Sequence, residues 1–179
     1  MNISQADNAI MSAVSAKMRS SALVAPSRTV QVEKLDWSLP GFHPRARVLT
    51  SFGQLPVEAL RLRDLVKTQS GRFLPVQWID KVTLDADFLE RHPQAQPISI
   101  PQNAFGQSVP AAAFMVSPGQ VVKMPASIMN GDMKLAKDLV GRTHIRRASQ
   151  ASVTYFMFHC GADTSVSVEG VWCKCAPRG

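Results

Sequence analysis

The sequence predicts a mainly β domain preceded by a helical extension. From residue 41 onward, short apolar or alternating runs recur between turns rich in Pro and Gly, which is the layout of an all-β domain. The chain has 179 residues, 45% of them hydrophobic and 18% charged, so it can bury a core. The expected strands are residues 46–50, 64–68, 73–80, 97–100, 113–117, 120–124, 152–159 and 164–173.

Residues 1–25 have a helical pattern. Ser4 and Asp7 have the spacing of a capping box, and the apolar residues that follow share one face. These apolar residues are Ile10, Met11, Val14 and Met18. We therefore expect a helical extension and linker over 1–40, the β domain over 41–175 and a short tail over 176–179.

Charge and composition narrow the compartment and the partners. The net charge is +7, which permits attraction to nucleic acid or anionic surfaces without proving either. The odd cysteine count (Cys160, Cys173, Cys175) is not a disulfide framework and favours a reducing compartment. No run of about 18 apolar residues and no signal-peptide segment occurs, so we expect no membrane span. The expected location is the cytoplasm, or outside the cell by a signal-independent route.

The segment Gly41–Ile79 carries the most specific pattern. A short apolar strand, RVLT, precedes the turn SFGQ, and PVEAL then leads through DLV to PVQWI. This order resembles the opening of Hint domains, the hedgehog/intein autoprocessing superfamily. The nearest match is a bacterial subgroup that opens with CF-x-P-G-T, P-V-E-x-L, G-D-x-V and P-V-x-W-I. Arg63 stands where that subgroup has the glycine of G-D.

The resemblance continues in the same order to Trp172. Pro97–Gly106 is similar to P-V-x-I-x-x-x-A-L-G, and Pro110–Val122 to P-x-x-D-L-x-V-S-P-x-H-x-V. Val153–His159 resembles the strand V-x-Y-x-H-L-x, and Val168–Trp172 resembles the A-E-G-x-W end. The resemblance implies a Hint-like all-β fold over about 41–173.

The reaction of the family, as the resemblance implies it, is an acyl shift. The first residue of the motif, a cysteine, serine or threonine, attacks the carbonyl before it. A histidine of the S-P-x-H block and a second histidine before A-E-G assist. This chain departs at all three positions, which become Gly41, Gln120 and Asp163. The sequence thus predicts a pseudo-enzyme without catalytic residues.

A structural interpretation stands beside the functional one at these positions. The run SPG at 117–119 is a common turn, which Gln120 would cap, and Asp163 suits an Asx turn. His43 lies beside Gly41, where it either faces the former active site or is an ordinary surface residue.

The cysteines give no metal prediction. In a strand, Cys173 and Cys175 point to one face, whereas His159 and Cys160 point to opposite faces, and no C-x-x-C spacing occurs. We expect Cys160 to be buried, the tail pair to be exposed, and neither metal nor cofactor to be bound.

Three functional hypotheses remain open. The first is a degenerate Hint domain that neither splices nor cleaves itself and serves as a binding or assembly module for an unknown protein partner. The second is a divergent autoprotease that cuts at Pro40–Gly41, with Gln120 polarising the carbonyl and Asp163 or His43 activating water. The third is a basic nucleic-acid-binding module centred on Lys134–Arg147, disfavoured because no aromatic residues interleave.

Overall fold

The structure is a computed structural model that describes residues 36–177. The predicted N-terminal helical extension falls on residues 1–35, outside the described residues, and the boundary near residue 40 stays a prediction. No helix among residues 36–177 is long and apolar enough to cross a membrane.

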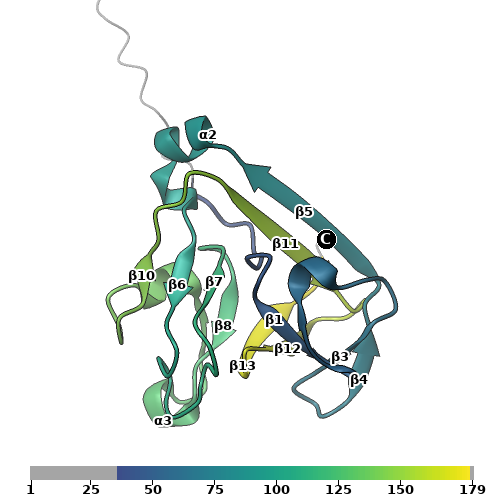
Figure 1. Cartoon of the computed structure of the whole chain (residues 1–179). Coiled ribbons are helices and arrows are strands. Elements are labelled where there is room, and N and C mark those ends of the chain that lie inside the picture. Colours follow the sequence, from purple (N-terminus) through teal and green to yellow (C-terminus); the bar gives the residue numbers. More distant parts are fainter. Residues whose placement is uncertain (1–35, 178–179) are drawn as a thin grey trace, which may run out of the picture. The chain divides into compact units, whose positions relative to one another are not determined.

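Residues 36–177 form mainly short β-strands, as the sequence predicts (Figure 1). The strands are β1 (Arg47–Thr50), β2 (Gly53–Pro56), β3 (Leu65–Lys67), β4 (Phe73–Pro75), β5 (Trp78–Leu84), β6 (Ile98–Ile100), β7 (Phe114–Val116), β8 (Val121–Lys123), β9 (Met133–Leu135), β10 (Arg146–Arg147), β11 (Val153–His159), β12 (Thr164–Val168) and β13 (Val171–Cys175). The helical pieces are η1 (Val57–Ala59), α2 (Ala86–Arg91), η2 (Pro93–Ala95), α3 (Ala126–Met129) and η3 (Ala136–Leu139).

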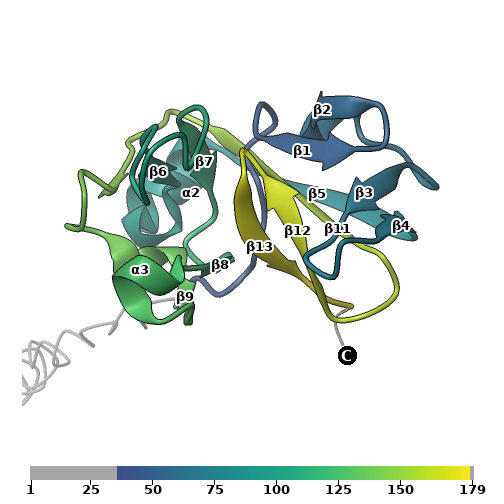
Figure 2. The same ribbon diagram turned by 90° about the horizontal axis from the view of Figure 1, so that it is seen from below.

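The strands form three sheets. The largest has the order β4-β3-β1-β12-β13-β8-β9, with β2 paired to the other edge of β1. A three-stranded sheet has the order β10-β6-β7, and β5 pairs with β11 in a long antiparallel ribbon. In both views the ribbon runs between the side of the domain that holds β3 and β4 and the side that holds α2 (Figures 1 and 2).

The core follows from period-two alternation along the strands. Val48, Val66, Val122 and Val166 come from four strands of the large sheet and are fully buried in one core cluster. Cys160, Cys173 and Cys175 belong to the same core cluster. The expectation of an exposed tail pair is therefore wrong for Cys173 and Cys175, because β13 directs its odd-numbered residues inward.

The β12–β13 turn is stabilised by an ion pair. Glu169 and Gly170 have φ of 49° and 83°, the left-handed values of a two-residue type I′ hairpin turn. The buried Glu169 carboxylate accepts hydrogen bonds from Arg47 Nε and Nη2, both at 2.9 Å, and from the Arg47 backbone N–H at 3.1 Å. Glu169 N–H in turn donates to Arg47 O at 2.9 Å. These bonds hold a conformation that a glutamate otherwise adopts rarely.

Replacing Glu169 by Gln should destabilise the domain by about 1–3 kcal/mol, because the neutral amide keeps one acceptor oxygen for Arg47 and places an NH2 group where the second acceptor was. Chemical denaturation measures the change. Asp163→Asn is the matched control, since the Asp163–Lys174 ion pair is exposed and should contribute about 0–1 kcal/mol. Equal losses in the two variants would contradict the role assigned to Glu169.

Candidate functional site

The segment 36–43 is inserted between two sheets. Phe42 N–H donates to Phe156 O at 2.8 Å, and Phe156 N–H returns a bond to Phe42 O at 2.9 Å. His43 N–H donates to Met115 O at 3.0 Å. The residues around Gly41 therefore connect β11 on one side with β7 on the other, and Phe42 is fully buried between them.

The turn Ser117–Gln120 is built against this segment. The buried Ser117 hydroxyl accepts a hydrogen bond from Trp37 Nε1 at 2.8 Å and donates one to Leu39 O. The Ser117 N–H donates to Gly41 O at 2.8 Å. A Cβ atom on Gly119 would lie 2.4 Å from the carbonyl carbon and oxygen of Ser38, so only glycine allows the two backbones to come this close.

Gln120 contacts the amide nitrogen of Gly41 directly. Its Oε1 accepts the hydrogen bond from Gly41 N–H at 3.1 Å. Its Nε2 donates to Val121 O at 3.0 Å and to Lys174 O at 2.9 Å, which uses both amide hydrogens. The side chain is buried, so these three bonds fix its orientation. Gln120 is therefore held as an acceptor toward Gly41 and has no proton to donate there.

Gly41 occupies a position with little space for a side chain. A Cβ atom added to it would lie 2.9 Å from Tyr155 Cβ and 3.3 Å from Phe156 O. Its φ of 157° is also one that residues with a side chain rarely adopt. Tyr155 cannot move away easily, because its hydroxyl donates to Ala95 O at 2.7 Å and its ring packs against Trp37.

Comparison with known proteins identifies this arrangement. A family model of the Hint domain matches residues 40–177. The chain belongs to the Hint domain family. The buried contact between Gln120 and Gly41 thus lies at the opening position of the Hint motif, where the resemblance places the nucleophile and the assisting histidine.

A solved intein structure shows the same fold. The MchDnaB-1 intein matches with a TM-score of 0.50 and 10% sequence identity, covering 76% of this chain and 99% of that chain. The gp41-1 intein and the AceL NrdHF class 3 split intein each match with a TM-score of 0.47, at 10% and 16% identity, covering 77% of this chain and 99% of theirs. At such identities the likeness concerns the fold alone. No curated protein matches the sequence.

Asp163, the third Hint position that departs from the family pattern, is not brought to Gly41. It lies in the exposed turn between β11 and β12, and its carboxylate pairs with Lys174 Nζ at 2.9 Å. Lys174 links Asp163 to Gln120, because its backbone carbonyl accepts from Gln120 while its side chain binds Asp163.

His43 is half-buried beside the Hint opening and lines a cavity of about 270 Å³ with Arg45, Ser99 and Met115. Its Nδ1 accepts a long hydrogen bond, 3.4 Å, from Arg45 N–H. Burial lowers its pKa from the usual 6.5, the charge of Arg45 lowers the pKa further, and Glu58 opposes both. Among the described residues, no hydrogen bond joins His43 to Gly41 or Gln120.

The cysteines offer no substitute for the missing Hint nucleophile. All three are buried, and burial raises the pKa of the Cys160 thiol to about 11, so it stays protonated near neutral pH. Within residues 36–177, no three His, Cys, Asp or Glu side chains gather in a position to hold a metal ion.

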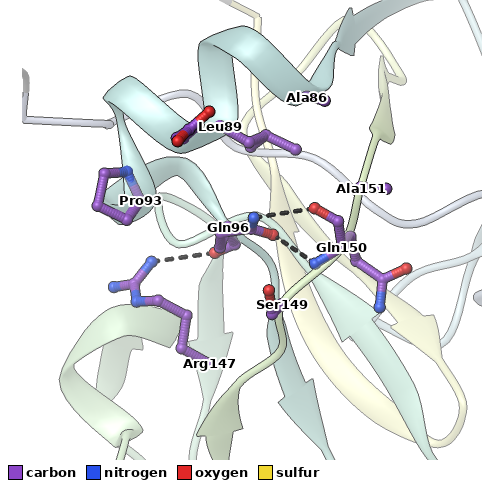
Figure 3. Close-up of a pocket in the computed structure, with 9 residues that line it drawn as sticks. Ala86, Leu89, Pro93, Gln96, Arg147, Ser149, Gln150 and Ala151 are labelled. Carbon is purple, nitrogen blue, oxygen red and sulfur yellow. Dashed lines mark hydrogen bonds between the residues drawn. The ribbon is translucent and has the colours of Figure 1, made fainter.

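Another hollow, of about 570 Å³, lies away from the Hint opening, between α2, η2 and residues 147–151 (Figure 3). Residues that line this hollow form hydrogen bonds with one another. Gln96 Nε2 donates to Gln150 O at 3.0 Å, Gln150 N–H donates to Gln96 Oε1 at 2.9 Å, and Arg147 donates to Gln96 O at 3.0 Å. These bonds tie η2 to the residues that precede β11.

Sequence reasoning missed the contribution of Ser117 and Trp37. The sequence presents Ser117 only as part of a common turn, although its hydroxyl and the Trp37 side chain form the buried bond that holds the segment before Gly41. The two residues are 80 positions apart, and no spacing in a single sequence reports such a contact.

Gly41→Cys should destabilise the domain by about 1–3 kcal/mol, because the new side chain must displace Tyr155 or Phe156. Thermal or chemical denaturation measures the loss. Gly106→Ala is the matched control: its φ of 130° is also unusual, but nothing lies within 4 Å of an added Cβ. A Gly41→Cys variant no less stable than the Gly106→Ala variant would show that the position has room.

His43 should make the domain less stable in mild acid. Because its pKa is lower in the folded than in the unfolded chain, the unfolded chain binds the proton more readily. The contribution of neutral His43 to the free energy of unfolding is therefore complete above pH 6.5. It is lost as the pH falls through the pKa of the folded state. Unfolding curves between pH 5 and 7.5 should show a shallower decline for His43→Gln than for the wild type. Identical declines would count against this assignment.

Proposed function

We propose that this protein is a non-cleaving Hint domain that acts as a binding or assembly module. The observation that carries the proposal is the bond from Gly41 N–H to Gln120 Oε1, at the position where a Hint reaction would begin. The site retains the contacts of the segment before Gly41 while lacking the groups that would release it.

The chemistry of the acyl shift explains why we expect no cleavage at Pro40–Gly41. The reaction needs a side chain to attack the Pro40 carbonyl, and Gly41 has none. It also needs a proton donor for the leaving amide nitrogen. Gln120 instead accepts the proton of that nitrogen in a hydrogen bond, which stabilises the intact peptide bond rather than its cleavage.

These contacts support the idea that the domain holds the segment 36–42 in a fixed place. Trp37 is buried against Tyr155 and Phe88, and Ser117 binds both Trp37 and Leu39. A chain held in this way connects whatever precedes residue 36 to the domain through a peptide bond that persists. A fixed anchor point is what an assembly module requires.

The autoprotease hypothesis receives less support. A hydrolytic cut at Pro40–Gly41 needs a base next to that bond, whereas Asp163 is paired with Lys174 in an exposed turn and His43 binds Arg45. The nucleic-acid hypothesis rests on the basic stretch 134–147, where Lys137 pairs with Asp36 at 2.8 Å and Arg147 binds backbone carbonyls. Both cations are already engaged within the protein.

The mass of the intact protein tests the main proposal. Incubated for days between pH 6 and 9, with and without a strong nucleophilic thiol, the full chain should keep one unchanged mass. A fragment that begins at Gly41 would contradict the proposal and favour the hydrolytic alternative.

The double variant Gly41→Cys/Gln120→His serves as the comparison, because it restores the two family residues at the positions that meet. If it cleaves and the wild type does not, the assay detects the reaction and the substitutions account for its loss. If the wild type cleaves as fast as the variant, Gly41 and Gln120 do not block the reaction.

A further inference from the structure

We propose that the protein docks on an anionic lipid surface through an exposed apolar patch beside β3 and β4. This docking patch consists of Phe52, Leu62, Leu65 and Phe73. The proposal is independent of the question of cleavage, because none of these residues touches the Hint opening.

The patch is unusual in its exposure. Phe52 is 94% exposed, Leu62 60%, Phe73 41% and Leu65 39%. Four of the eight large apolar side chains exposed on residues 36–177 thus fall between residues 52 and 73. Scattered exposed apolar residues are ordinary in proteins, but a group of this kind on one surface marks an interaction site.

Backbone bonds bring Phe52, Leu65 and Phe73 to one surface, and Leu62 lies in the turn that leads into β3. Ser51 N–H donates to Leu65 O at 2.9 Å, which places the β1–β2 turn and Phe52 next to the start of β3. Leu65 pairs with Pro75 and Lys67 with Phe73, so the outward residues of β3 and β4 share one face. Both views show β1, β3 and β4 side by side on the same side of the domain (Figures 1 and 2).

Phe52 is held outward by its own turn. Phe52 N–H donates to Thr50 Oγ1 at 3.2 Å, and the same hydroxyl donates to Gly53 O at 2.8 Å. A turn closed by these bonds presents the ring to solvent without further ordering. Insertion of the ring into an interface therefore costs little additional conformational entropy.

The charges around the docking patch favour a negatively charged partner. Its basic neighbours are Arg61, Arg63, Lys67 and Arg72. Lys67 lies over the Phe73 ring, with Nζ 4.8 Å from its centroid, while Arg61, Arg63 and Arg72 are exposed. The nearby Asp64 accepts from Arg61 N–H, and Glu58 follows β2 on η1. The excess is positive, as it is for the whole chain at +7.

These charges argue against a second copy of the chain as the partner, since two such patches would repel each other. Addition of a strand at the β4 edge is also disfavoured, because Pro75 has no N–H to offer there. A fluid lipid interface accepts protruding rings without a matching pocket, and each basic residue near an anionic headgroup layer contributes about 1 kcal/mol.

Co-sedimentation with vesicles tests the proposal on the full chain. The protein should bind vesicles that contain phosphatidylserine and phosphatidylcholine, bind phosphatidylcholine alone far less, and dissociate as salt rises. Phe52→Ser/Leu62→Ser should lower the partition coefficient about tenfold or more. Ile128→Ser/Val140→Ser removes two exposed apolar side chains elsewhere and should leave binding unchanged.

A second pair of variants tests the charges. Arg61→Gln/Arg63→Gln/Arg72→Gln should weaken binding by about tenfold or more. Lys134→Gln/Arg142→Gln/Arg146→Gln removes the same charge elsewhere and should weaken binding much less. Equal losses in the two triple variants would overturn the assignment to this surface.

Other outcomes also overturn the proposal. They are no binding to anionic vesicles, equal binding to neutral ones, and full binding by the Phe52→Ser/Leu62→Ser variant. A dimer seen by sedimentation velocity that this variant abolishes would instead identify a second copy as the partner. Mass spectrometry of the bound protein reports any cleavage separately, so failure of this proposal and failure of the proposed function are distinguishable.

Discussion

Burial of the backbone around Gly41 is the constraint on which the site depends. A peptide segment that passes between two sheets loses its water, so its N–H and C=O groups need partners inside the protein. Phe156, Met115, Ser117 and Gln120 provide these partners. The same bonds that make the fold possible therefore determine which groups surround Gly41.

Gln120 shows how one side chain can hold the segment around Gly41 without an acid or a base. A histidine and a glutamine can both accept a hydrogen bond from a backbone N–H, so the packing of the segment tolerates the exchange. Only the histidine can also carry a proton near neutral pH. Under the proposed function, glutamine at this position keeps the hydrogen bond to the segment and supplies no proton donor. Gly41 completes the change, because the space next to it is occupied by Tyr155.

The β12–β13 turn is another place where tertiary contacts hold the backbone. Glu169 belongs to the segment that resembles the A-E-G-x-W end of the family, and its carboxylate connects this turn to β1. Arg63 is a parallel case, since it stands where the family has glycine and keeps a left-handed φ of 74°. Its backbone N–H donates to Val76 O at 2.8 Å, which helps to hold this conformation. Tertiary contacts in both places maintain backbone shapes that the residue type alone disfavours.

The sequence by itself determined the alternation of short strands and turns, because the period of apolar residues and the positions of Pro and Gly are local properties. The order of motifs was enough to indicate the Hint family and to show that Gly41 has no side chain to act as a nucleophile.

Local patterns failed where contacts between distant residues decide the structure. The run KLAKDLV at 134–140 begins in β9 and then forms the short helix η3, because Val121 and Val122 pair with its first residues. Cys173 and Cys175 are buried because β8 and β12 flank their strand. Only the tertiary structure decided that Gln120 accepts from the Gly41 N–H instead of polarising the Pro40 carbonyl, and that Asp163 stays in an exposed turn. The reason is physical: hydrogen bonds and packing between residues about 80 positions apart depend on how the sheets come together, which no local pattern records.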